Sequence, residues 1–166
     1  AVISHATVPV YVVRSNNAPR VSVESENNSG VIVPLDGSEL SESALDTAIQ
    51  MAELSAAPIY LLRVVNDALD IGNGRIAKAY LDQISEQLAK RKVLAIPLLM
   101  SGHAGASIIQ TMEARPGSVV VMTSRGAGGV TRWVRGSVAD WLIQRAPGPI
   151  VVVANKREAL LGSVIH

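Results

Sequence analysis

Residues with phosphate-binding chemistry are concentrated in one stretch of the chain, residues 119–138. Its first four residues, 119–122, are Val and Met, the composition of a fully buried parallel strand. Three glycines follow soon after this strand, at Gly126, Gly128 and Gly129. Because glycine has no Cβ, a loop built from it can turn sharply and approach a ligand closely. The stretch therefore predicts a loop that cradles phosphate.

A helix is predicted after this loop. Gly136 and Ser137 precede an apolar, helix-like segment that starts at Val138, ten residues or more past Gly126. Ser137 is a favourable N-cap residue, and Asp140 three positions later forms an approximate capping box with it. The free amides and positive dipole end of such a helix would face the glycine loop, which is the usual physical basis of anion binding.

The spacing of these residues, Thr123-x2-Gly126-x9-Gly136-Ser137, resembles a motif of the universal stress protein family. Nucleotide-binding members of that family carry G-x2-G-x9-G-[ST] after their fourth strand, and three of the four positions match here. Thr123 replaces the first glycine, and it adds both bulk and a hydroxyl that could bond to ribose or phosphate. The resemblance implies ATP, or ADP or AMP, as the ligand, with Mg²⁺ or Mn²⁺ accompanying the phosphates through oxygen atoms and water.

Two other phosphate-binding motifs do not apply. The signature G-x4-G-K-[ST] occurs nowhere in the chain, so a P-loop ATPase is excluded. Residues 72–77 fit the loose dinucleotide pattern, but they lie several residues beyond the end of the preceding predicted strand. That fingerprint needs its glycines in the first strand-to-helix turn. We therefore interpret Gly72 and Gly74 as a plain loop that leads into a helix over residues 76–91.

A carboxylate follows the first predicted core strand, residues 31–35. Asp36 is followed by Gly37 and by Ser38, a candidate helix cap, so it stands where a residue at the carboxyl end of a strand can contact a ligand. The resemblance implies that Asp36 and Pro34 frame adenine and ribose. The alternative is a turn aspartate whose carboxylate bonds its own backbone.

The second predicted strand, residues 59–65, supplies a further part of the implied site. By the resemblance, the backbone of Val64 lines the adenine slot, whereas the alternative is a core valine. Arg125 lies close enough in sequence to the glycine loop to add positive charge, and a solvated arginine is the alternative there. The implied nucleotide-binding residues are Pro34, Asp36, Val64, Thr123, Arg125, Gly126, Gly136, Ser137 and Val138.

The composition favours an α/β fold and argues against several classes of protein. Hydrophobic residues make up 48% of the 166 residues, but aromatics only 3% with no Phe, so the interior must be Val, Ile, Leu and Ala. The net charge of +1 and the lack of a long basic run leave no electrostatic footprint for nucleic acid or an anionic membrane. The absence of cysteine rules out disulfide and thiolate chemistry and agrees with an expected cytoplasmic location.

Five strands alternating with four helices predict a parallel α/β sheet with helices on both faces. The strands are predicted over residues 31–35, 59–65, 94–100, 119–122 and 150–154. The resemblance implies the order 3-2-1-4-5 of the adenine nucleotide alpha hydrolase-like fold, with the switch point between the first and fourth of these strands. Open α/β sheets bind ligands at such a point. Asp36 and the glycine loop are therefore expected on opposite sides of one crevice.

An additional strand is predicted near the N-terminus. Residues 5–13 align with residues 145–153 with four identities in nine, and the proline and the apolar strand are in register. We interpret residues 1–29 as the end of a preceding, similar domain with a polar linker, residues 30–155 as a universal stress protein domain, and residues 156–166 as a tail. A chance similarity between two Val-rich strands is the alternative.

The last strand of the predicted sheet is an exposed, Val-rich edge that needs a partner. Members of the resembled family dimerise through this strand. We therefore expect residues 9–13, which start at Pro9 and end at Val13, to pair antiparallel with residues 149–153, which start at Pro149 and end at Val153. The pairing would lie within one chain or between neighbours, giving a tandem pseudo-dimer or a homodimer.

Two functions agree with these features. The leading hypothesis is a stress-response or signalling module that binds adenine nucleotide and neither nucleic acid nor membrane. Its rival is a nucleotide-free homotypic dimerisation and interaction module of the same fold, in which Thr123 partly fills the slot. No convincing general base or water-positioning residue accompanies the glycine loop, so we predict no catalytic residue and at most slow ATP hydrolysis. No metal-binding residue is predicted either.

Overall fold

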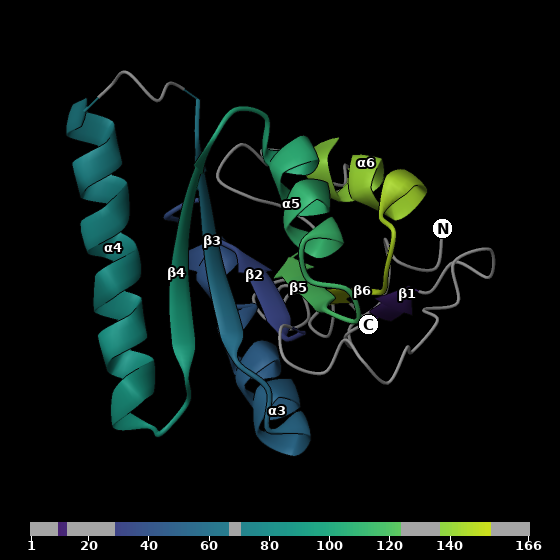
Figure 1. The fold of residues 1–166 in the computed structure, drawn as a ribbon, viewed down its shortest axis with the longest axis horizontal. Coiled ribbons are helices and arrows are strands. Elements are labelled where there is room, and N and C mark those ends of the chain that lie inside the picture. Colours follow the sequence, from purple (N-terminus) through teal and green to yellow (C-terminus); the bar gives the residue numbers. More distant parts are fainter. Residues whose placement is uncertain (1–9, 13–28, 67–70, 124–136, 154–166) are drawn as a thin grey trace, which may run out of the picture.

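Figure 1 shows strands gathered in one sheet, with helices packed against both of its faces. This computed structural model describes residues 10–12, 29–66, 71–123 and 137–153. The strands are β1 (Val10–Val12), β2 (Val31–Pro34), β3 (Ile59–Val65), β4 (Ala95–Ser101), β5 (Val119–Thr123) and β6 (Ile150–Val153). The helices are α2 (Glu39–Glu42), α3 (Leu45–Ser55), α4 (Ile71–Lys90), α5 (Ala104–Glu113) and α6 (Ser137–Arg145).

The order of the strands confirms the predicted α/β topology. Across the sheet the strands run β1-β6-β5-β2-β3-β4, and all neighbouring pairs except β1 and β6 are parallel. Counted along the chain from β2, the five parallel strands therefore have the order 3-2-1-4-5. The sheet has a sixth member because the short N-terminal strand joins its edge.

The N-terminal strand pairs with the last strand of the same chain. The register of this antiparallel pair joins Val10 to Val152 and Val12 to Ile150, which confirms the predicted partners. β1 thereby covers the edge of β6, and its central Tyr11 is 54% exposed. The end residues of the predicted strand, Pro9 and Val13, lie outside the described residues.

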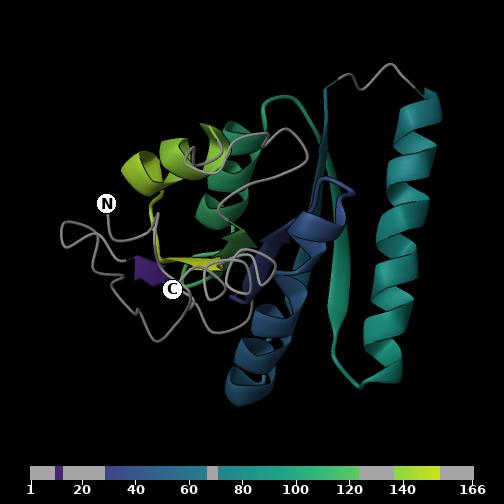
Figure 2. The same cartoon turned by 180° about the vertical axis from the view of Figure 1, so that it is seen from behind.

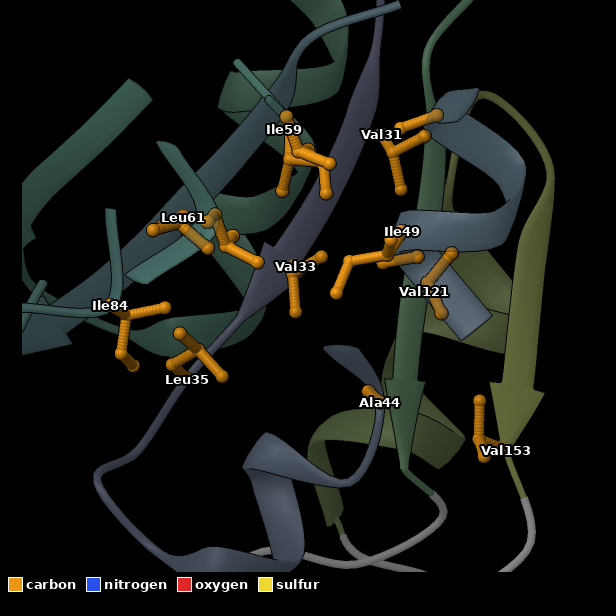
Figure 3. Close-up of a cluster of buried hydrophobic side chains, with 14 of the residues drawn as sticks. Val31, Val33, Leu35, Ala44, Ile49, Ile59, Leu61, Ile84, Val121 and Val153 are labelled. Carbon is orange, nitrogen blue, oxygen red and sulfur yellow. The ribbon is translucent and has the colours of Figure 1, made fainter. Parts of the chain in front are cut away.

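Alternating side chains divide the interior into two clusters, one on each face of the sheet. On the first face, buried residues of α3 and α4 pack on β2, β3, β5 and β6, and Figure 3 shows Ile49 and Ile84 among the strand side chains there. On the second face, α5 and α6 pack on the same four strands. Burying one such Leu, Ile or Val side chain contributes about 1.5–3 kcal/mol. The two clusters thus hold the helices, and with them the ends of the strands, in fixed positions.

The helix α4 differs from its prediction at its start. It begins at Ile71, so Gly72 and Gly74 lie in its first turns, and their interpretation as a plain loop was wrong. The first amides of a helix have no intrahelical partner in any case, and each glycine there costs about 1 kcal/mol relative to alanine. The apolar face that follows offsets this cost. It contains Ala77, Leu81, Ile84 and Leu88, all buried, with Tyr80 packed against them.

The two views in Figures 1 and 2 place α4 along the β3–β4 side of the sheet, at the end remote from β1. The helix α2 was not predicted. It is only four residues long, and the sequence Glu-Leu-Ser-Glu is too short to show an apolar period. This short helix lies directly after Asp36 and becomes important at the candidate site.

Candidate functional site

The helices that connect onward from β2 and β5, the two central strands of the sheet, pack on opposite faces of it. These strands are parallel neighbours, with Val31 beside Val119. After β2 the chain continues to α3 on the first face, whereas α6, which follows β5 in the chain, packs on the second face. The carboxyl ends of the two strands therefore mark the switch point of an open α/β sheet, as predicted.

Asp36 lies at this edge, two residues beyond the end of β2, and is exposed. Its Oδ1 accepts hydrogen bonds from the backbone N–H of Ser38, at 3.0 Å, and from the Ser38 hydroxyl, at 2.5 Å. The turn-aspartate interpretation is thus realised in the structure. The same bonds hold the carboxylate at the carboxyl edge of the sheet, where a ligand could reach it.

Two serines extend this turn into α2. Ser38 is the N-cap of the helix, and its Oγ accepts a hydrogen bond from the N–H of Ser41 at 3.1 Å. The buried hydroxyl of Ser41 donates to the carbonyl of Ser38 at 2.9 Å and accepts from the N–H of Asp36 at 3.2 Å. The backbone and the carboxylate of Asp36 are therefore both fixed by the first turn of α2.

The side chain of Arg63, in β3, contacts the backbone next to Asp36. Its Nη1 donates a hydrogen bond to the carbonyl of Leu35 at 3.3 Å. A Cβ at Gly37 would lie 3.2 Å from the same nitrogen, so the guanidinium would have to move by a few tenths of an ångström, and the φ of +83 at Gly37 is a conformation that favours glycine. The Nε of Arg63 is buried and has no hydrogen-bond partner in the described part of the chain.

Tyr80 of α4 reaches the far end of α2. Its hydroxyl donates a hydrogen bond to Oε1 of Glu42 at 2.9 Å, and the guanidinium carbon of Arg63 lies 5.9 Å from the centre of its ring. Burial raises the pKa of Tyr80 well above its usual value, and the hydrogen bond to Glu42 and the negative charge of Glu42 raise it further. The phenol therefore stays protonated and remains a donor.

The sequence predictions missed both of these supporting residues. Arg63 could have been found, since a charged residue within an otherwise apolar strand is a signal of a specific role. The contact between Tyr80 and Glu42 joins residues 38 positions apart, and nothing in the local pattern of either helix indicates it.

Val64 and Pro34 lie at the carboxyl ends of β3 and β2. The side chain of Val64 is partly buried and packs against the second cluster, as the core-valine interpretation predicts. Pro34 is partly buried and stands beside Leu62. The roles of Pro34 and of the Val64 backbone at adenine stay predictions.

The phosphate side of the predicted site is only partly described. Arg125, Gly126 and Gly136 lie outside the described residues. Thr123, expected just after the strand, is instead the last residue of β5, paired with Val153 and 4% exposed. A β-branched residue such as Thr fits a strand well, so the strand runs one residue further than the apolar pattern suggested.

The start of α6 also differs slightly from its prediction. Ser137 is the first residue of the helix, whereas the prediction made it the residue before the first turn. Asp140 lies in the first turn, where a carboxylate favours the helix dipole. Ser137 is exposed, and Val138 packs against the second cluster.

The described ranges contain neither a candidate metal cluster nor a candidate membrane-spanning helix. There, no three or more His, Cys, Asp or Glu side chains come together in a way that could hold a metal ion. None of the helices in these ranges combines the length and the apolar composition needed to span a bilayer.

The fold and the polar edge between β2 and β5 define the chain as an α/β domain of the adenine nucleotide alpha hydrolase-like type. The sequence model of the universal stress protein family matches residues 28–154, most of the chain. The chain therefore belongs to the universal stress protein family.

Similar proteins support this assignment. The universal stress protein MJ0531 of Methanocaldococcus jannaschii is 27% identical over 141 residues, which cover 77% of this chain and 83% of that protein. Rv1996 of Mycobacterium tuberculosis is 26% identical over 162 residues, which cover 79% of this chain. The match to Rv1996 spans only 50% of that protein.

Several solved structures share the fold. The structure of MJ0577 has a TM-score of 0.71 and 22% identity, covering 78% of this chain and 97% of that one. A universal stress protein in complex with cAMP has a TM-score of 0.60 and 22% identity over 76% of this chain and 97% of its own. One from Archaeoglobus fulgidus in complex with dAMP has a TM-score of 0.59 and 20% identity over 75% and 97%.

Proposed function

We propose that this chain binds an adenine nucleotide, ATP in the first instance, at the switch point between β2 and β5, and serves as a stress-response or signalling module. The observation that carries the proposal is Asp36, whose exposed carboxylate is held by Ser38 at the carboxyl edge of β2. Structures with the same fold in complex with cAMP and with dAMP support adenine nucleotide as the ligand class.

In this proposal the two sides of the switch point recognise different parts of the ligand. Pro34, Asp36 and the backbone of Val64 would frame adenine and ribose. The backbone amides of the loop after β5 and of the start of α6 would hold the phosphates, with the residues Gly126, Gly136, Ser137 and Val138. Arg125 and the hydroxyl of Thr123 would add contacts, and Mg²⁺ or Mn²⁺ would accompany the phosphates.

The arrangement supports binding rather than turnover. The carboxylate of Asp36 already accepts two hydrogen bonds from Ser38, and these hold it in one orientation. An oriented acceptor is suited to a ribose or adenine donor, and no general base or water-positioning residue is predicted beside the glycine loop. We expect hydrolysis of bound ATP to be slow at most.

The rival function also has one observation in its favour. Thr123, in the place of the family glycine, is almost fully buried at the end of β5. If its side chain fills the space that a nucleotide would need, the domain would act through protein contacts alone. Mass spectrometry of the supernatant after denaturing the purified protein separates the two functions. Recovered ATP, ADP or AMP supports the first, and its absence together with no binding at millimolar nucleotide supports the rival.

Site variants test the placement of the ligand. Asp36→Asn keeps an oxygen that can accept from Ser38 but removes the charge, and should weaken ATP binding by about ten- to a hundredfold in calorimetric titration. Gly136→Glu should abolish binding through bulk and charge. The control is Glu53→Gln, an exposed residue of α3, which should bind ATP as the original chain does. Unchanged affinity in both site variants would show that the ligand lies elsewhere.

The N-terminal strand leads to a proposal about assembly. β1 covers the edge of β6 from within the chain, and the match to Rv1996 spans half of that protein. We propose that β1 is the end of a preceding, similar domain, and that the pair imitates a family dimer. A chain starting at residue 29 should then dimerise in analytical ultracentrifugation, while the present chain should stay monomeric. Equal masses per particle would contradict this.

A further inference from the structure

The short helix α2 is held from a distance by a residue outside the proposed nucleotide site. Tyr80, in the middle of α4, donates its hydroxyl hydrogen to Oε1 of Glu42 at 2.9 Å. Glu42 is the last residue of α2. The contact is partly buried, and it joins a helix on the β3–β4 side of the sheet to the turn at the switch point.

The other end of α2 is bonded to Asp36. Five hydrogen bonds among Asp36, Ser38 and Ser41 connect the carboxylate and backbone of Asp36 to the first turn of the helix. A four-residue helix has too few internal bonds to be stable by itself. Its position, and with it the position of Asp36, therefore depends on contacts outside the helix, which are the buried Ala44 at the start of α3 and the hydrogen bond at Glu42.

We propose that the hydrogen bond between Tyr80 and Glu42 is a tether through which α4 positions Asp36 for the nucleoside part of the ligand. The inference rests on the proposed function and adds two positioning residues to it. Neither residue needs to touch the ligand. The tether acts on nucleoside recognition alone, because the proposed phosphate contacts come from β5 and α6 on the other side of the switch point.

Conservative variants remove the tether without disturbing the core. Tyr80→Phe deletes the hydroxyl and keeps the ring beside Arg63. Glu42→Ala deletes the acceptor, and Glu42→Gln keeps an oxygen that can still accept. The control is Asp82→Asn, which breaks the exposed ion pair between Lys78 and Asp82 on the same helix.

The first measurement compares adenosine with tripolyphosphate as ligands. Tyr80→Phe and Glu42→Ala should each weaken adenosine binding by about three- to tenfold, and the double variant should be no worse than either. Tripolyphosphate binding should stay the same, and Glu42→Gln and Asp82→Asn should bind adenosine almost normally. Equal losses for adenosine and tripolyphosphate, additive losses in the double variant, or no loss would overturn the proposal.

The second measurement separates the tether from the proposed function. Hydrogen exchange should be faster at the amides of Ser38 and Ser41 in Tyr80→Phe, while the amides of α3 keep their rates. Unchanged exchange overturns the tether whether or not nucleotide binds. If exchange rises but the original chain binds no adenine compound, the proposed function fails and the positioning of Asp36 by α4 stands.

Discussion

At each end of the parallel strands, an arginine guanidinium lies beside a tyrosine ring. The amino edge is the end where these strands begin, and the carboxyl edge is the end where they finish. At the amino edge, the guanidinium carbon of Arg115 lies 4.4 Å from the centre of the Tyr60 ring. At the carboxyl edge, that of Arg63 lies 5.9 Å from the centre of the Tyr80 ring. Both arginines have a buried Nε with no hydrogen-bond partner in the described ranges. The same arginine–tyrosine contact therefore occurs in two different surroundings.

The surroundings differ in what they leave exposed. At the amino edge, Tyr60 and Ser118 are buried, and the N–H of Gly30 donates to the Ser118 hydroxyl in a buried hydrogen bond. At the carboxyl edge, Asp36 and Gly37 are exposed. The hydrogen bond between Gly30 and Ser118 at the amino edge is buried, whereas the polar groups of the Asp36 turn at the carboxyl edge are held at the surface. A binding site needs exposed polar groups in fixed positions, whereas a hydrophobic core does not need them.

The largest expected effect is at the closed amino edge. A Cβ at Gly30 would lie 2.5 Å from the carbonyl oxygen of Pro58, which is backbone and cannot easily move. Gly30→Ala should lower the free energy of unfolding by about 3 kcal/mol in urea denaturation. The control is Gly74→Ala in α4, where nothing lies within 4 Å. It should raise the stability by about 0.5–1 kcal/mol. Similar losses in both variants would contradict the tight packing of this edge.

The two arginines give a direct test of the comparison. Arg63→Met and Arg115→Met keep an apolar stem and remove the guanidinium from the ring, so each should lose about 0.5–2 kcal/mol of stability. Only Arg63→Met should also weaken adenosine binding, because Arg63 supports the carbonyl of Leu35 next to Asp36. Calorimetric titration of the folded variants checks this. Equal loss of affinity in both would mean that the carboxyl edge has no special role.

The smallest expected effect is a pH dependence at the carboxyl edge. The folded chain raises the pKa of Tyr80, chiefly by burial, above the value of about 10 in the unfolded chain. As the pH rises above about 10, the unfolded chain loses this proton first, so folded stability should fall. In Tyr80→Phe the free energy of unfolding should fall less steeply over that range. Equal slopes in the two proteins would show that the phenol is not held in its neutral form.

The sequence predicted the strands of the sheet well, because buried parallel strands are continuous apolar runs and β2, β3, β5 and β6 are of that kind. Their order and the switch point came from the resemblance to the universal stress protein family. The sequence also predicted Asp36 at the carboxyl edge, since a strand end fixes the position of the next residue. It missed α2 and the early start of α4. Gly72 and Gly74 disfavour helix at the start of α4, and α2 is too short to show an apolar period.

The supporting contacts of the site could not be predicted locally. The hydrogen bond from Arg63 to Leu35 crosses between neighbouring strands, and the one from Tyr80 to Glu42 crosses between helices. The spacing of Tyr80 from Ala77 and Ile84 is that of one apolar helix face, but its hydroxyl partner depends on the tertiary fold. The position of Asp36 could be predicted from the sequence pattern, whereas the contacts of Arg63 and Tyr80 that support it could not.

The most direct test of the account is a nuclear magnetic resonance titration of the labelled chain with ATP. We predict that the largest amide shifts occur at Asp36, Ser38 and Val64 on one side of the switch point and at Ser137 and Val138 on the other. Amides at the amino edge, such as that of Ser118, should not shift. No shift up to millimolar ATP, or shifts confined to the amino edge, would contradict a nucleotide site between β2 and β5.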